Sequence, residues 1–294
     1  MRLVAQKGSA AKDERSAASA SPIQKNLARP SAEEIFTQVA KNARQELQRP
    51  SLALGLSGYG AGVFMGLSAL GTAIAIGLLG HGTTAVVISR MFYPLGFIVV
   101  MLGRSQLFTE NTLYPIALVL AEKREFWNTM RLWSVVLPMN VAGALTFAVL
   151  AAWTPGLQAS TLHALADLGA EALRHPSTQI FWSGVFAGWM IALAAWLVSG
   201  SHSITGSVII IWMLTFVVGL GNYAHCVASS CEILVTVLRG GATWHAYWWW
   251  FLLATGGNIC GGVVMVTILE YGQVMHGKMV EAAAAEARRE MAEE

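Results

Sequence analysis

Among the ionisable side chains inside long apolar stretches of this sequence, four are the ones best suited to handle a solute. They are Arg104, Glu110, His225 and Glu232. Ionisable groups are costly in an apolar medium, and where they occur they mark solute paths or proton relays. Imidazole gains or loses a proton near neutral pH, so His225 is the candidate for donating or relaying one. These residues predict a polar passage through an apolar layer.

The composition indicates that this layer is a membrane. Apolar residues make up 55% of the 294 positions, charged residues make up 12%, and the mean hydropathy is +0.53. A membrane-spanning helix needs about 20 apolar residues, and six blocks are long enough. They cover roughly residues 52–79, 84–120, 127–153, 178–198, 205–238 and 247–270. We therefore expect an all-α integral membrane protein with six transmembrane helices in a lipid bilayer, and no nucleic-acid partner.

Two of the six blocks are too long for one span, and each contains a polar, glycine-bearing interruption. The interruptions are GRSQ at 103–106 in the second block and GLGN at 219–222 in the fifth block. Backbone groups freed by a break are tolerated at membrane depth only inside protein or beside a water-filled cavity. We expect helices two and five to be broken and to frame a solute path, the alternative being two ordinary kinks.

The two halves of the sequence share short strings in the same order. The pairs are VVMLG at 99–103 with VVGLG at 217–221, NVAGA at 140–144 with NICGG at 258–262, and GVF at 62–64 with GVF at 184–186. The first two pairs are 118 residues apart and the third is 122 residues apart. Since each half holds three spans, the second half enters the bilayer from the opposite side, which predicts an inverted 3+3 repeat.

The flanking segments predict four regions along the chain. Residues 1–30 read as a disordered basic tail, residues 31–49 as an amphipathic interfacial helix, residues 51–272 as the six-span channel domain, and residues 273–294 as a helical tail. The interfacial helix opens on a capping box and ends before Pro50. Its apolar stripe consists of Phe36, Val39, Ala43 and Leu47.

The basic residues predict the orientation, because Lys and Arg collect on the cytoplasmic side of a membrane. With the N-terminus inside, 15 of the 19 basic residues lie on the inner side. Arg90, Arg174 and Arg239 lie on the outer side, and Arg104 lies in a break. We expect both termini to be cytoplasmic.

The cysteines give no sign of a metal site. Cys226, Cys231 and Cys260 all lie in apolar blocks and match no metal-ligand spacing, so we expect neither a metal nor a cofactor. An enzyme that uses Cys226 with His225 is poorly supported, because adjacent helical residues point about 100° apart. We do not expect an enzyme.

Two motifs resemble those of the formate/nitrite transporter family. FYPLGF at 92–97 followed by LFTENT at 107–112 is similar to its second-span signature, and YAHCVAS at 223–229 is similar to its fifth-span motif. The resemblance implies an aquaporin-like protomer in a homopentamer of the bacterial inner membrane. It also implies passage of small monovalent anions such as formate or nitrite, or of the neutral acid, by a passive channel or a proton-coupled transporter.

The resemblance also implies which residues line the path. His225 matches the family's central histidine, and the other candidates are Tyr93, Phe97, Leu107, Phe108, Thr109, Val218 and Asn222. Two further path positions depart from the family pattern, since Ser183 replaces the usual Lys and Gly188 replaces an Asn. Ala224 replaces the Glu before the histidine. The chain resembles a divergent, less characterised branch.

Several roles stay open at this point. His225 either passes a proton or stays neutral and hydrogen-bonds the solute or Thr109. Arg104 and Glu110 either contact the solute or form an ion pair with each other, Glu232 either joins them or faces cytoplasmic water, and His202 reads as a solvated loop residue. The alternative functions are a pore for a neutral solute, and a non-transporting membrane scaffold or stress protein.

Overall fold

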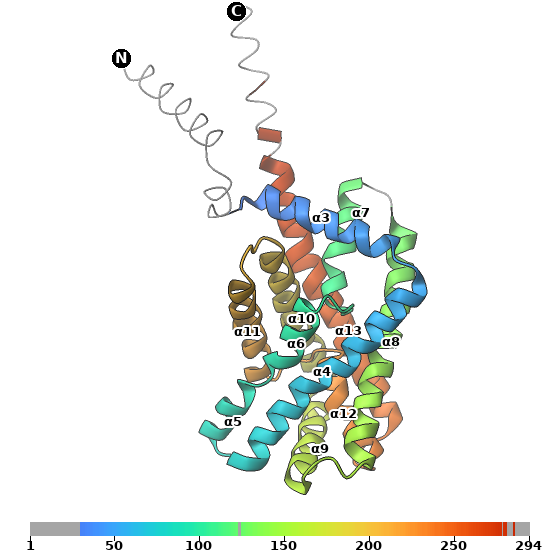
Figure 1. The fold of residues 1–294 in the computed structure, drawn as a ribbon, viewed down its shortest axis with the longest axis vertical. Helices are drawn as coiled ribbons and strands as arrows, with labels where there is room; N and C mark the ends of the chain where they lie inside the picture. Colours follow the sequence, from blue (N-terminus) through green and yellow to red (C-terminus); the bar gives the residue numbers. More distant parts are fainter. Residues whose placement is uncertain (1–29, 123–124, 278, 281–284, 286–294) are drawn as a thin grey trace, which may run out of the picture. The chain divides into compact units, whose positions relative to one another are not determined.

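The computed structural model describes residues 30–122, 125–277, 279–280 and 285. The predicted tail at 1–30 and most of the predicted tail at 273–294 therefore lie outside the described residues. The chain divides into Met1–Ser31 and a second unit, Ala32–Glu294. Secondary structure in the described part of the second unit is entirely helical (Figure 1).

The helices follow the apolar blocks closely. They are α4 (Ser51–Leu79), α5 (Thr83–Arg90), α6 (Pro94–Leu102), α7 (Tyr114–Glu122), α8 (Phe126–Trp153), α10 (Ser177–Ser199), α11 (Ile204–Leu220), α12 (Ala228–Leu238) and α13 (Trp244–Gly262), which continues as the π-helix η2 (Val263–Ile268). Five stretches of the described chain are long and apolar enough to cross a membrane, and α11 and α12 are shorter apolar helices. The prediction of a multi-pass helical membrane protein is confirmed.

The second and fifth blocks are interrupted where the sequence predicts it. Helix α6 is followed by a loop and the short 3-10 helix η1 (Glu110–Thr112) before α7, and a loop at 221–227 separates α11 from α12. Both upstream helices end in the same way. The residue just past each end, Arg104 or Asn222, has a positive φ, of 56° or 51°. An arginine in the left-handed region is uncommon, because a side chain there crowds the backbone.

The hydrogen bonds at these two ends match pair by pair at the offset of 118. They are Gly103 N to Val99 O and Gly221 N to Val217 O, each 2.9 Å, and Ser105 N to Val100 O and Tyr223 N to Val218 O, each 3.0 Å. The bonds from Ser105 N and from Tyr223 N each reach five residues back along the chain, as in a Schellman motif. Helix-end carbonyls are thereby satisfied inside the apolar layer.

Two buried asparagines hold the loops that follow the breaks. The side chain of Asn140 in α8 accepts from Phe108 N at 2.9 Å and donates to Gly58 O at 2.7 Å and to Gln106 O at 2.8 Å. Asn258 in α13 repeats the pattern with Cys226 N at 2.9 Å, and with Gly184 O and Ala224 O at 2.8 Å each. Each asparagine ties its loop to a neighbouring helix.

The same bonds correct the register of the third string match. Asn140 binds Gly58 and Asn258 binds Gly184, so the first helices of the two halves correspond at an offset of 126. The GVF strings, at an offset of 122, are one helical turn out of register. Short apolar strings recur by chance, whereas a shared hydrogen bond identifies equivalent positions.

The interfacial segment of the first half has a counterpart that the sequence did not suggest. Helix α3 (Ala32–Gln48) precedes α4, and α9 (Ala159–Arg174), which was not predicted, precedes α10. Pro50 and Pro176 occupy the caps of α4 and α10 with nearly the same φ and ψ. Helix α3 packs on α7 and α9 packs on α12. The two lie at opposite ends of the helical body, which we call the α3 face and the α9 face (Figure 1).

The apolar stripe of α3 is confirmed, but protein covers it. Phe36, Val39, Ala43 and Leu47 are all buried, together with Ala40. The helix contacts α7, α10 and α8, and the ring of Phe36 lies 5.9 Å from that of Tyr271. The stripe therefore fixes α3 across the ends of other helices.

The asparagine clamp predicts a large loss of stability on truncation. Asn140→Ala leaves one N–H and two carbonyl groups unpaired in a buried site, so we expect a cost of about 2–4 kcal/mol. The melting temperature of the purified protein in detergent should fall by about 5 °C or more. Asn128→Ala, on the exposed start of the same helix, is the matched control. Equal melting temperatures for the two variants would contradict the clamp.

Candidate functional site

The two interrupted helices are joined by a hydrogen bond between side chains. Thr109 Oγ1, from the first loop, lies 2.9 Å from His225 Nε2, from the second loop. Both residues have an exposed fraction of 0%. The two positions are 116 residues apart in sequence, so only the fold brings them together. The contact therefore joins the loops of the two breaks.

The other nitrogen of the imidazole determines its tautomer. His225 Nδ1 lies 3.0 Å from the backbone N of Ala228 and accepts a hydrogen bond from that N–H group. Because a backbone N–H can only donate, Nδ1 carries no proton, and the neutral ring has its proton on Nε2. Nε2 therefore donates to Thr109 Oγ1. Both nitrogens are engaged, which favours the neutral hydrogen-bonding ring among the two roles left open for His225.

One aromatic ring lies beside the imidazole, and a second ring lies beside the first. Phe97 meets His225 edge to face, with centroids 5.0 Å apart and an interplanar angle of 83°, and Tyr93 lies 5.5 Å from Phe97. Both aromatic side chains are buried, as is Val218 on α11. The structure thus gathers Tyr93, Phe97, Thr109 and His225 at one place, where apolar walls surround one pair of hydrogen-bonding groups.

Two of the expected path residues have other contacts. The ring of Phe108 meets Trp133 of α8 edge to face at 5.4 Å, and its backbone N–H is held by Asn140. A Cβ on Gly188 would collide with the carbonyl oxygen of Asn258, so this glycine serves the close approach of α10 and α13. These contacts support the loops and helices around the site, and the place of Phe108 and Gly188 on the path stays a prediction.

Ser183 and Asn222 support the second loop. Ser183 Oγ accepts from Ala224 N at 3.3 Å. Asn222 Nδ2 donates to Glu171 Oε1 at 3.1 Å and lies 3.4 Å from His175 Nε2, which ties the loop to α9 and the residue after it. The Asn222 side chain is thus engaged at the α9 face.

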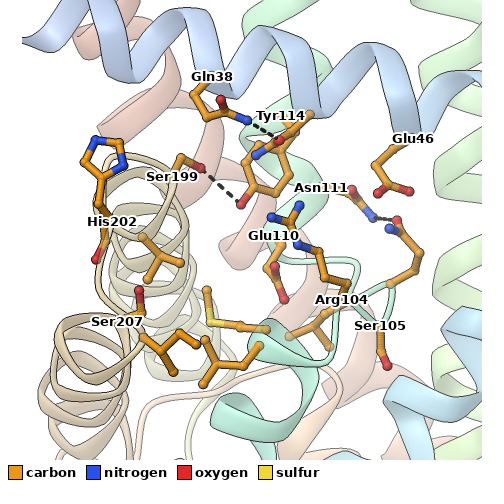
Figure 2. Close-up of a pocket in the computed structure, with 18 residues that line it drawn as sticks. Gln38, Glu46, Arg104, Ser105, Glu110, Asn111, Tyr114, Ser199, His202 and Ser207 are labelled. Carbon is orange, nitrogen blue, oxygen red and sulfur yellow. Dashed lines mark hydrogen bonds between the residues drawn. The ribbon is translucent and has the colours of Figure 1, made fainter. Parts of the chain in front are cut away.

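A cavity of about 390 Å³ opens at the α3 face (Figure 2). Its wall includes Leu107, directly before the Phe108–Thr109 pair, and two charged residues of the first break, Arg104 and Glu110. Helix α3 contributes Glu46, and the turn between α10 and α11 contributes His202. His202 is exposed, as expected, but it also lines this cavity. Sequence reasoning missed these contributions because they come from distant segments.

Of the two roles left open for Arg104 and Glu110, the ion pair between them does not form in the described chain. Neither side chain forms an ion pair or a hydrogen bond with another residue of the described chain, and Glu110 Oε1 is buried. Glu232 also differs from expectation, because it is 5% exposed, with Oε1 buried and unpaired among the described residues. It lies on α12, which packs against α9, so it does not face open water.

Comparison with known proteins identifies the family. A family model described as "Formate/nitrite transporter" matches residues 33–272. The chain belongs to the formate/nitrite transporter family. It is therefore a membrane transport protein, which agrees with its spanning helices and confirms the motif resemblance.

Relatives and solved structures support this assignment. The chain is 29% identical over 244 residues to "Inner membrane protein YfdC" of Escherichia coli, covering 82% of this chain and 78% of the relative. It is 28% identical to "Probable formate transporter" of Methanothermobacter thermautotrophicus, covering 64% and 74%. A solved "FNT family ion channel" has a TM-score of 0.73 at 20% identity, covering 81% of this chain and 98% of that chain. A "Pentameric formate channel with formate bound" has a TM-score of 0.64 at 18% identity, covering 76% and 98%. The structural likenesses establish the fold.

The tautomer predicts how Thr109 substitutions will behave. Thr109→Val keeps the shape but removes the acceptor for His225 Nε2–H, so we expect a loss of about 1–3 kcal/mol in the free energy of unfolding. Thr109→Ser keeps the hydroxyl and should stay near the parent protein. Melting curves of both variants in detergent measure the difference. A valine variant as stable as the serine variant would show that the bond contributes nothing.

Proposed function

We propose that each protomer conducts a small monovalent anion such as formate or nitrite, or its neutral acid, through a path beside His225. The observation that carries the proposal is the buried Thr109–His225 hydrogen bond, which joins the loops of the two breaks. Family membership and relatives named as formate transporters support the choice of solute. His225 serves as a neutral donor to Thr109, and the solute passes between this pair and the ring of Phe97.

The physical chemistry of the path favours the neutral acid at its centre. Moving a bare anion into an apolar constriction costs many kcal/mol, whereas the neutral acid avoids most of that cost. Helix α12 begins at Ala228, directly after the second loop, and directs its positive dipole end toward that loop. This end contributes about 0.3–1 kcal/mol toward attracting an anion. The helix dipole thus attracts the anion to the loop, and protonation of the anion lowers the free-energy cost of moving it through the apolar constriction.

The architecture that we propose is six spans in an inverted 3+3 repeat, with helices two and five broken, in an aquaporin-like protomer. The matched breaks, the two asparagine clamps and the paired helices α3 and α9 support it. A homopentamer follows by analogy with the solved pentameric formate channel. We also propose that the protein lies in the inner membrane with both termini in the cytoplasm. Helix α3 would take an interfacial position, and a tail would flank the 51–272 channel domain at each end.

Flux into liposomes tests the proposal directly. Purified protein in vesicles should admit labelled formate, and unlabelled nitrite should compete with it, because both anions would use the same path. Empty vesicles give the background. If the protein vesicles show no uptake above that background between about pH 5 and about pH 7.5, where a weak acid changes its charge state, the proposal is wrong.

A pair of neighbouring valines tests the position of the path. Val218 is 0% exposed and Val217 is 41% exposed on the same helix. Val218→Phe adds bulk beside the path, so we expect about a tenfold lower formate flux, which corresponds to about 1.4 kcal/mol on the barrier to passage. Val217→Phe points away and should retain the parent flux. Size-exclusion profiles confirm that both variants assemble, and equal flux would place the path elsewhere.

A further inference from the structure

The geometry of His225 leaves the proton of the neutral acid without a source. Nδ1 accepts the Ala228 N–H, and the proton on Nε2 is held by Thr109. Giving up the Nε2 proton would produce an imidazolate, which is far too basic to form here. Another group must therefore supply the proton if the anion is neutralised before it reaches the apolar rings.

The cavity at the α3 face holds a carboxyl group suited to that task. Glu110 lines the cavity, and its Oε1 is buried without a hydrogen-bond partner in the described chain. Arg104 lines the same cavity, and no partner in the described chain engages its guanidinium group (Figure 2). The cavity thus contains a positive group that can hold an anion. It also contains a carboxyl group that can exchange a proton with that anion.

The two breaks differ at this position, although their backbones match. Arg104 and Asn222 occupy equivalent left-handed positions. The Asn222 side chain is bonded to Glu171 at the α9 face, whereas the Arg104 side chain extends into the α3-face cavity without a partner. Arginine is unfavourable in this conformation, and its side chain forms no ion pair or hydrogen bond with another described residue, which is consistent with a role toward a solute.

We propose that Glu110 protonates the anion in the α3-face cavity while Arg104 holds it, before it passes Leu107. This inference rests on the proposed transport function and adds a proton-exchange site to it. The Arg104 guanidinium donates to one oxygen of the anion. The O–H bond of the Glu110 acid breaks, and a new O–H bond forms on the anion, so that the neutral acid leaves and Glu110 remains as a carboxylate. Water at the α3 face then returns a proton to Glu110.

The other titratable groups around the cavity do not compete for this role. Glu46 of α3 is bonded to Arg49 at 2.9 Å. The hydroxyl of Tyr114 on α7 lies 3.4 Å from Ser199 Oγ. His202 lies in the exposed turn before α11. Glu110 is therefore the carboxyl group of this cavity that has a buried oxygen without a hydrogen-bond partner in the described chain.

The test is labelled formate uptake into liposomes that contain the full-length protein, at about pH 7.5 and about pH 5. A carboxylic acid with a pKa of about 4 is almost entirely ionised at the higher pH, and the solution itself supplies neutral acid at the lower pH. For Glu110→Gln we expect uptake about tenfold or more below the parent at pH 7.5, as on loss of a general acid, and near the parent at pH 5. Asp167→Asn, the equivalent carboxyl-to-amide change on the exposed side of α9 and outside the cavity, should match the parent at both values.

The possible outcomes distinguish the proton-exchange site from the transport function on which it rests. A Glu110→Gln variant with the parent's pH dependence would overturn the inference and leave the transport function standing. Absence of uptake by the parent protein at both pH values would instead refute the transport function itself. If Glu110→Gln fails to assemble, Arg104→Gln takes its place: loss of uptake at pH 7.5 alone supports the site, and unchanged uptake overturns it.

Discussion

The structure depends on satisfying backbone groups that two interrupted helices leave open inside an apolar layer. Each break frees N–H and carbonyl groups that lipid cannot pair. The Schellman-like ends at Arg104 and Asn222 satisfy the helix ends, and Asn140 and Asn258 satisfy the loops that follow. One amide side chain per half meets three backbone groups. Non-helical backbone can therefore persist at this depth without collapsing into a continuous helix.

Because Asn140 and Asn258 hold the two loops in place, the side chains of the loops have fixed positions at the site. The first loop presents Thr109 and the second presents His225, and the two bond to each other in a fully buried position. The Ala228 N–H, at the start of α12, fixes the imidazole tautomer. The same backbone feature that ends the break therefore orients the central side chain. This coupling makes His225 a rigid hydrogen-bonding group rather than a free base.

The matched halves also make their differences informative. Equivalent backbone positions carry an anchored asparagine at the α9 face and an unanchored arginine at the α3 face. The α3 face adds Glu110, with an unpaired buried oxygen, to the same cavity. The two ends of the helical body, the α3 face and the α9 face, are thus chemically distinct.

The sequence by itself determined the spans, the two breaks and the family, because hydropathy, glycine-bearing interruptions and the LFTENT and YAHCVAS motifs are local properties of the chain. It also placed His225 and Thr109 in the right segments, through the motifs. It misplaced the GVF register and did not suggest α9. The tertiary structure alone decided these points, along with the missing Arg104–Glu110 ion pair and the cavity shared by α3, the first break and the α10–α11 turn. The physical reason is that side-chain direction and pairing depend on contacts between segments far apart in sequence, such as the 116 residues between Thr109 and His225.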